Sequence, residues 1–287
     1  MFNCILVRYG EIALKSPYVR AKFEDLLVYN IRAGLASAGL DYKVRKFFGR
    51  LYVEGHSKKA GDVLKRVFGI VSFSPASEIG TDLEKIKLES LKIAKKHIKK
   101  SDTFAIDCNR AGKHAFTSQD VEKLVGTEIV KNIRSRVDLS KPKKILGIDV
   151  RQDKTYIFAK TVRGPGGIPL GSQGTVVAVI EDMNGLVASW MFMKRGCCIV
   201  PIFIGNGKKY LKTICKWHIG REVKPYFLKK YSSKKIENIA KENNVPAIIT
   251  GESLDSTKKI NYTVFRPLVG FDKNSLRKLR KRIAYLG

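Results

Sequence analysis

Apolar positions in the first 70 residues change repeatedly between the period of a strand and that of a helix. Residues 3–9 form an apolar run typical of a strand, and residues 20–38 place Phe23, Leu27 and Ile31 at helical spacing. An extended stretch through 44 and 47–53, bent at Gly49, and a short helix over 59–68 follow. This order predicts a small βαββα unit of the split-βαβ type.

The pattern between residues 82 and 161 predicts a second α/β module. Its expected elements are an amphipathic helix over 82–99, a strand over 103–108, a helix over 118–136, a strand over 145–150 and its hairpin partner over 155–161. Segment 163–174 holds five glycines and two prolines in twelve residues, which is typical of a linker.

Beyond the linker, strand and helix patterns alternate in a way that favours a parallel sheet. We expect strands over 176–180, 198–204 and 247–250 and helices over 186–195, 233–242 and 273–285. A strand, a helix and a strand in succession indicate a parallel crossover. The fold class predicted for the whole chain is therefore α/β, with two or three domains in 287 residues.

The charge of the chain indicates what kind of partner it binds. The formal net charge is +29, distributed as +5 over residues 1–58, +10 over 59–170 and +14 over 171–287. A basic surface spread over folded segments favours a nucleic-acid backbone as partner, although a general lysine bias gives the same composition. No apolar run reaches the length of a membrane span and no secretory signal is present, so we expect a cytoplasmic protein without membrane contact.

Cysteine and histidine spacing points to no metal site and no catalytic pair. The five cysteines contain no C-x-x-C pair, and the four histidines lie far apart. Cys197 and Cys198 fall between a helix end and a strand start, where packing is the expected role. We accordingly assign neither catalytic nor metal-binding residues.

One loop combines cations with a helix start. Arg110, Lys113 and His114 follow the strand at 103–108, where they could clamp phosphates. Thr117 and Ser118 could cap the next helix, whose first amides would add to an anion site. The alternative is that these cations are merely solvated.

A second basic stretch lies between residues 208 and 235, where ten cations alternate with aromatic residues. Lys208, Lys209 and Lys230 belong to it. Basic and aromatic side chains together suit RNA, because bases stack while phosphates are neutralised. The competing interpretation is a lysine-rich surface whose aromatic rings turn into the core.

Three segments carry a resemblance to the tRNA 4-thiouridine synthetase (ThiI) family: Arg8–Ser16 with Phe23 and Asn30, Phe104–Phe116, and Val162–Gly174. The resemblance implies a ferredoxin-like domain over 1–58, a THUMP RNA-binding domain over 59–165, a linker over 166–171 and a Rossmann-like PP-loop domain, similar to adenine nucleotide alpha hydrolases, over 172–287. It also implies that Lys15, Arg110, Lys113 and Arg163 face tRNA. In the third domain, Met191–Gly196, Thr250–Leu254 and Arg266–Lys273 resemble family segments.

The nucleotide loop departs from the family pattern. Where the family carries Ser-Gly-Gly-x-Asp-Ser, this chain has Ile180–Val187 with Glu181, Asp182, Asn184 and Gly185, and no glycine pair. Such a loop works by presenting bare amides to a pyrophosphate, and side chains block that approach. Like charges about 4 Å apart repel by about 4 kcal/mol at an effective dielectric near 20. The segment after Thr250–Leu254 is also shortened, and no sulfur-bearing cysteine follows.

The leading hypothesis is a tRNA-binding protein that has lost ATP-dependent adenylation, needs no cofactor, and works beside a tRNA-modifying or sulfur-carrier enzyme. The alternative is an active, ATP- and Mg²⁺-dependent tRNA sulfurtransferase that receives sulfur from another protein. A third hypothesis is a general RNA chaperone acting through charge alone. Dimerisation through the third domain is left open by the sequence.

Overall fold

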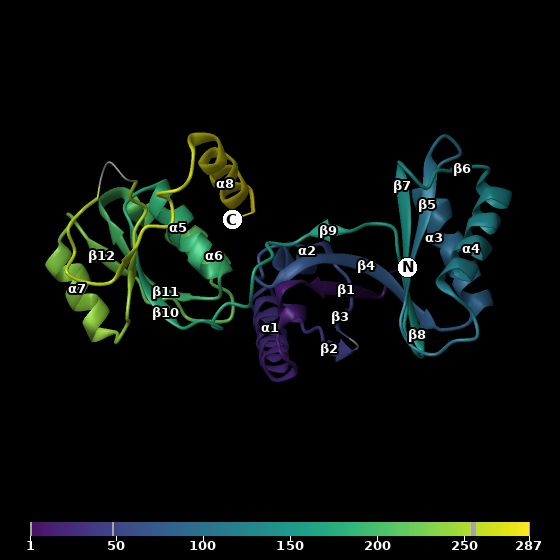
Figure 1. The fold of residues 1–287 in the computed structure, drawn as a ribbon, viewed down its shortest axis with the longest axis horizontal. Helices are drawn as coiled ribbons and strands as arrows, with labels where there is room; N and C mark the ends of the chain where they lie inside the picture. The colour runs from purple at the N-terminus through teal and green to yellow at the C-terminus, as the bar shows by residue number, and fades with distance from the viewer. Residues whose placement is uncertain (1, 48, 254–256, 287) are drawn as a thin grey trace. The chain divides into compact units, whose positions relative to one another are not determined.

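The computed structural model describes residues 2–47, 49–253 and 257–286 (Figure 1). The chain divides into two compact units. The first unit comprises Met1–Arg8, Tyr42–Lys58 and Ser72–Arg163, and the second comprises Tyr9–Asp41, Lys59–Val71 and Gly164–Gly287. The domain boundaries expected from the sequence stay a prediction.

A nine-stranded sheet, counted over the described residues, organises the first unit. Its order is β2-β3-β1-β4-β8-β7-β5-β6, with β9 paired to β4. The strands are β1 Cys4–Tyr9, β2 Val44–Phe47, β3 Arg50–Glu54, β4 Ile70–Gly80, β5 Thr103–Arg110, β6 Arg136–Val137, β7 Lys144–Val150, β8 Lys154–Phe158 and β9 Val162–Arg163. The strand patterns expected at 3–9, 103–108, 145–150 and 155–161 are confirmed.

Strand β4 was not predicted from the sequence. It runs for eleven residues, pairing antiparallel with β8 through residues 77–80 and with β9 through Ser72 and Phe73. Pro75 lies near its middle and lacks an amide donor, which argues against a strand when the sequence is read alone.

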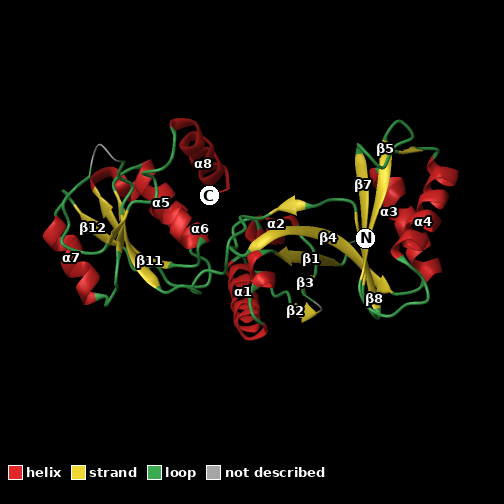
Figure 2. Cartoon of the chain, viewed as in Figure 1, coloured by secondary structure: helices red, strands yellow, loops and turns green. Residues whose placement is uncertain are grey.

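Two helices cover one face of the part of the sheet formed by β8, β7, β5 and β6 (Figure 2). They are α3 Leu83–His97, capped by Asp82, and α4 Ser118–Ile133. Ile86, Val121 and Val125 pack with Leu146 and Ile148 into the core beneath them. The helix expected over 118–136 ends earlier, because Arg134 adopts a left-handed conformation with φ +59° and residues 136–137 pair with β5.

The second unit contains a parallel sheet of five strands within the described residues, in the order β12-β11-β10-β13-β14. They are β10 Thr175–Ile180, β11 Cys198–Ile204, β12 Tyr226–Leu228, β13 Ile248–Ile249 and β14 Val264–Phe265. The expected parallel crossover is confirmed, since β10 pairs parallel with β11 over six residues.

Helices lie on both faces of this sheet, as in doubly wound folds. Helices α5 Met183–Lys194, α6 Leu211–Trp217 and α8 Lys273–Leu286 contribute to one core, and α7 Ser233–Glu242 contributes to the other. The unit also holds η1 Glu11–Leu14, α1 Pro17–Ser37, α2 Lys58–Leu64 and η2 Gly205–Tyr210. Helix α2 is shorter than the 59–68 expected, whereas α5 is closed at Gly196 as expected, with φ +88°.

None of the helices in the described part of the chain combines the length and the apolar character needed to cross a membrane.

Candidate functional site

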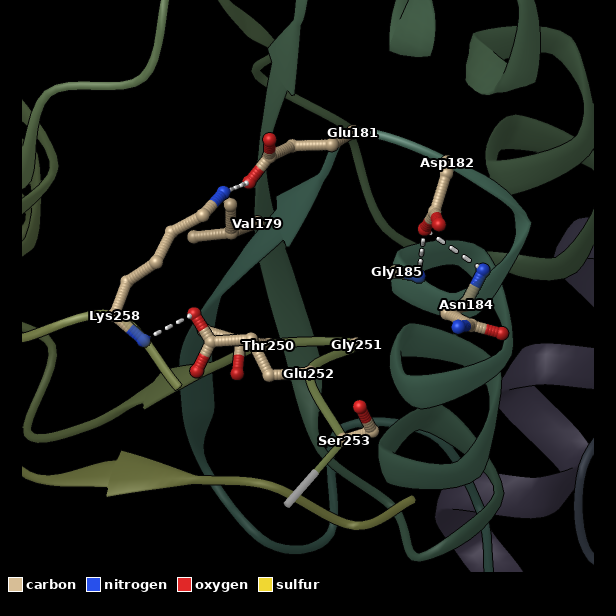
Figure 3. A pocket seen from close by; sticks show the side chains of 10 residues that line it. All are labelled: Val179, Glu181, Asp182, Asn184, Gly185, Thr250, Gly251, Glu252, Ser253 and Lys258. Atoms are coloured by element: carbon tan, nitrogen blue, oxygen red, sulfur yellow. Dashed lines mark hydrogen bonds and ion pairs between the residues drawn. The ribbon is translucent and has the colours of Figure 1, made fainter. Parts of the chain in front are cut away.

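The carboxyl end of β10 opens a pocket of about 390 Å³ in the second unit (Figure 3). Strand β10 has β11 on one side and β13 on the other, so the sheet order reverses there. Ligands of open α/β sheets bind at such switch points. The four residues of the predicted nucleotide loop, Glu181, Asp182, Asn184 and Gly185, line this pocket together with Val179, Thr250, Gly251, Glu252, Ser253 and Lys258.

Asp182 occupies the N-terminus of α5. Its Oδ1 atom accepts hydrogen bonds from the amides of Asn184 at 2.9 Å and Gly185 at 3.1 Å. These amides belong to the group that would otherwise bind an anion at a helix start. A carboxylate of the chain itself therefore satisfies them (Figure 3).

The backbone around this helix start is tightly packed. A Cβ on Gly185 would lie 2.7 Å from the carbonyl oxygen of Val179, and one on Gly251 would lie 2.2 Å from the amide nitrogen of Gly185. Both distances are far below normal van der Waals contact. The chain after β13 thus packs directly against the first turn of α5.

The other charges in the pocket are paired. Lys258 Nζ lies 2.5 Å from Glu181 Oε1 and 4.1 Å from the ring centre of Tyr231. Arg266 Nε donates to Glu252 Oε2 at 2.8 Å. Burial, reinforced by Glu252 and Glu181, raises the pKa of Tyr231 to about 12. The side chains of the Lys258–Glu181 pair are 39% and 38% exposed, so the pair adds at most about 1 kcal/mol to stability.

Arg110 ends β5 in the first unit, and Lys113 and His114 lie in the loop that follows it. Arg110 Nη1 donates to the Gly112 carbonyl at 3.2 Å, and the His114 ring stacks on Phe116 with 5.2 Å between centroids. The loop groups these cations at the carboxyl end of β5, as expected from the sequence.

Gln152 holds this loop and was missed by the sequence analysis. Its Oε1 accepts from the Lys113 amide at 3.0 Å, and its Nε2 donates to the Lys113 carbonyl at 3.5 Å. Gly112 permits the approach: its φ is +113°, and a Cβ there would lie 2.7 Å from Gln152 Oε1. Only the pairing of β5 with β7 brings the turn after β7 to this loop, so no local signal could have found it.

The start of α4 does not add to an anion site, which corrects the expectation. The Thr117 hydroxyl caps the helix by accepting from the Asp120 amide, and the Asp120 carboxylate accepts from the Thr117 amide and hydroxyl. These bonds lower the pKa of Asp120. The capping box places a negative charge where an anion would bind.

The remaining predicted cations lie apart. Arg163 is in β9 and pairs with Ser72 of β4, and strands β8 and β7 lie between β4 and β5 in the sheet order. Lys15 belongs to the second unit, where it lines a hollow with Thr175 and Ala247 at the amino edge of the parallel sheet. Lys208, Lys209 and Lys230 follow β11 and β12 at the opposite, carboxyl edge of that sheet.

Most aromatic rings of the 208–235 stretch turn toward the core. Trp217 is 1% exposed and packs with Trp190, and Tyr210 and Tyr231 also pack on the two cores. Phe227 is the exception, because it is 50% exposed and lies 5.4 Å from Lys208 Nζ. A stacking surface on this stretch therefore reduces to Phe227 and its neighbouring lysines.

No group of three or more histidine, cysteine or acidic side chains able to hold a metal occurs within residues 2–47, 49–253 and 257–286. Leu254, Asp255 and Ser256, which belong to the resembling segment and its shortened continuation, lie outside the described residues.

Comparison with family models defines the class. The model of the ThiI ferredoxin-like domain matches residues 4–74, and that of the THUMP domain matches residues 80–160. The chain is thus a THUMP protein with a ferredoxin-like N-terminal part and a third, parallel-sheet α/β part.

The relatives identify the family. A probable tRNA sulfurtransferase of Thermococcus kodakarensis is 32% identical over 335 aligned residues, covering 99% of this chain and 88% of the relative. One of Methanocaldococcus jannaschii is 33% identical, covering 97% and 87%. The chain belongs to the ThiI-like tRNA sulfurtransferase family. Because the first alignment is longer than this chain, that relative carries internal residues that this chain lacks.

Two solved structures share the fold. PH1313 from Pyrococcus horikoshii matches with a TM-score of 0.86 and 28% identity, over 98% of this chain and 99% of that one. A 4-thiouridine synthetase in complex with RNA and bound ATP matches with a TM-score of 0.84 and 25% identity, over 100% and 86%.

Proposed function

We propose that this protein binds tRNA through its THUMP part and does not itself bind and use ATP at the end of β10. It would then act beside a separate tRNA-modifying or sulfur-carrier enzyme in the cytoplasm. The domain division at 58, 165 and 171 and the tRNA-facing roles of Lys15, Arg110, Lys113, His114, Arg163, Lys208, Lys209 and Lys230 belong to the same proposal.

The observation that carries the proposal is the bond between Asp182 and the first amides of α5. A triphosphate would have to displace this carboxylate from those amides and then sit beside it. Asp at an N-cap stabilises a helix by about 1 kcal/mol relative to Ala, so the displacement has a cost before any repulsion is counted.

Glu181 and the packing of Gly251 act in the same direction. Glu181 sets a second carboxylate at the pocket, and its partner Lys258 is used in neutralising it. Because Gly251 packs directly on Gly185, a phosphate would have to lie in the pocket beside this contact, next to the carboxylates of Glu181 and Asp182. The residues present do not fit a pyrophosphate, so no step through ATP is derived for this chain.

The tRNA-binding part rests on different support. A THUMP domain matches residues 80–160, and a solved relative holds RNA. The net charge of +29 supplies the long-range attraction. The Arg110–His114 loop, fixed by Gln152, offers donors at one sheet edge.

An active sulfurtransferase that uses ATP and Mg²⁺ is the second candidate. One feature favours it: Thr250 Oγ1 is buried, lines the pocket and has no hydrogen-bond partner in the described residues. A bound ligand would supply one. Sulfur would then come from another protein.

ATP binding tests the proposal directly. Equilibrium dialysis with labelled ATP and Mg²⁺ should detect no binding to the wild type up to millimolar ATP. The double variant Glu181→Gly, Asp182→Gly should gain measurable affinity, since a glycine N-cap costs only a few tenths of a kcal/mol relative to Asp. Asp272→Gly is the matched control, because Asp272 caps α8 through the same pair of amide bonds. Micromolar binding by the wild type would contradict the proposal.

The tRNA interface has its own test. Reversing both charges, Arg110→Glu with Lys113→Glu, should weaken tRNA binding at least tenfold in a gel shift, because two phosphate contacts become repulsions. Reversal of Lys95 and Lys96 on α3 controls for net charge. Equal loss in both double variants would mean that the loop has no special role.

A further inference from the structure

A hollow on the first unit lies between α4 and the β5–β6 edge of the sheet, lined by residues of β5 that precede the Arg110 loop and residues of α4 that follow it. Its volume is about 660 Å³, and its lining includes Phe104, Gly126, Val130, Val137 and Leu139. Phe104 and Gly126 are buried, whereas Val130, Val137 and Leu139 are 41%, 44% and 80% exposed. We call this surface the α4 groove.

Gly126 keeps the groove open. It lies in the interior of α4, where glycine destabilises a helix by roughly 1 kcal/mol relative to Ala. A Cβ at this position would meet no atom within 4 Å, so core packing does not require the glycine. Its φ is not in the left-handed region, so backbone conformation does not require it either. What the glycine does provide is space at the bottom of the groove.

The rim of the groove is cationic. Lys123 and Lys131 line it from α4 and are exposed, and neither has an ion-pair partner among the described residues. Arg136 in β6 stands next to Val137. The lining carboxylate, Glu122, is engaged, since it accepts from the Cys108 amide at 3.0 Å. An apolar hollow with unpaired cations at its rim matches a ligand that is apolar and anionic.

The shape favours a helix as this ligand. Strand β6 ends the sheet order, but it has only two residues, so pairing along its edge offers few hydrogen bonds. The groove follows α4, and amphipathic helices dock in such grooves through side chains at i, i+4 and i+7. A second copy of the chain is disfavoured, because a symmetric contact would face Lys123 and Lys131 with their own copies. RNA is disfavoured because the walls are aliphatic.

We propose that the α4 groove binds an amphipathic helix of a partner protein, with apolar anchors on one face and acidic residues beside them. The site belongs to the first unit, whereas the pocket at the end of β10 belongs to the second, and binding of the helix does not depend on tRNA. Complexes of this kind owe most of their affinity to a few apolar anchors, and charge at the rim sets partner choice.

Binding of two labelled 15-residue helical peptides to the full chain, measured by fluorescence anisotropy, tests the groove. Both peptides carry Leu at i, i+4 and i+7. At the flanking positions one peptide carries Glu and the other carries Lys. The Glu peptide should bind the wild type and bind Gly126→Leu at least tenfold more weakly, because the leucine fills the hollow. The Lys peptide should bind at least tenfold more weakly than the Glu peptide. The double variant Lys123→Glu, Lys131→Glu should reverse the preference.

Gly80→Leu is the matched control. A Cβ at Gly80 also meets no atom within 4 Å, but Gly80 belongs to β4 and does not line the groove. Thermal unfolding verifies that Gly126→Leu folds; replacement of a helical glycine should raise stability. No Glu-peptide binding at 1 mM, or equal binding by Gly126→Leu, overturns the proposal. If the wild type forms a dimer that the Gly126→Leu substitution dissociates, the groove binds a second copy and the proposal is overturned. If Gly126→Leu loses tRNA affinity tenfold, the groove binds RNA and the proposal is overturned as well.

Discussion

The side chain of Asp182 occupies the first free amides of α5 and so determines what the N-terminus of this helix can bind. The sequence predicts that Glu181 and Asp182 bring negative charge to the loop, and both residues do line the pocket. The sequence did not predict that Asp182 would bond to the amides at 184 and 185, or that Glu181 would pair with Lys258, 77 residues further along the chain. The Asp182 cap depends on the local loop conformation, which the sequence does not determine. The Glu181–Lys258 pair depends on where the chain after β13 lies.

Gln152 gives a prediction at the same scale, because it acts through Lys113 rather than on RNA itself. Gln152→Ala removes both hydrogen bonds that hold the Lys113 backbone. We expect tRNA affinity to fall about threefold to tenfold, and the slope of log K against log salt to fall by up to about 1, as when one phosphate contact is lost.

The double variant Gln152→Ala, Lys113→Ala shows whether Gln152 acts by positioning Lys113 or only by stabilising the fold. If Gln152 acts by placing Lys113, the losses in Gln152→Ala and Lys113→Ala will not add, since contacting residues are coupled. Gln173→Ala, an exposed glutamine of the second unit, should leave binding unchanged. Fully additive losses with an unchanged salt slope would show that Gln152 does not position the lysine.

At the scale of elements, His218 ties the end of α6 to β11. Its Nε2 accepts from the Ile199 amide at 3.2 Å, and its Nδ1 faces the Arg221 carbonyl at 3.3 Å. This arrangement suits the neutral ring with the proton on Nδ1, and burial lowers the pKa of His218 below 6.5. A protonated ring would set N–H against N–H at Ile199.

The pH dependence follows from that shift. Below pH about 6.5 the unfolded chain takes up the His218 proton first, so the unfolding free energy falls as pH drops toward the lower folded pKa and is undiminished above 6.5. Urea unfolding followed by tryptophan fluorescence reports this unit, because Trp190 and Trp217 both lie in its core. His218→Gln should flatten the profile between pH 7.5 and 5.5. An identical slope in both proteins would exclude His218 as its source.

Elements with strong local signals were predictable, and those defined by partners were not. Helices α3, α5 and α7 combine apolar periodicity with a capping Asp or Ser, and each was expected close to its observed position. Strands β12 and β14 contain only three and two residues, and only their pairing with β11 and β13 makes them strands. The groove on α4 was likewise invisible, because β6 completes it.

At the scale of the whole molecule, the charge and the third part of the chain point to one division of labour. The net charge is positive in every segment of the chain and rises to +14 over residues 171–287. The parallel-sheet fold of the sulfurtransferase family is retained there, while the pocket at its switch point is lined by the carboxylates of Glu181 and Asp182, and Asp182 occupies the helix start. Under the proposed function, we therefore expect this family member to bind RNA without turning over ATP.

The most direct test is tRNA-dependent formation of AMP and pyrophosphate from ATP by the purified full chain. A tRNA gel shift on the same preparation controls for correctly folded protein. The account predicts no turnover above background together with an intact, salt-sensitive tRNA shift. Turnover that depends on tRNA and is lost in the Glu181→Gly, Asp182→Gly variant would contradict it and would establish an active tRNA sulfurtransferase.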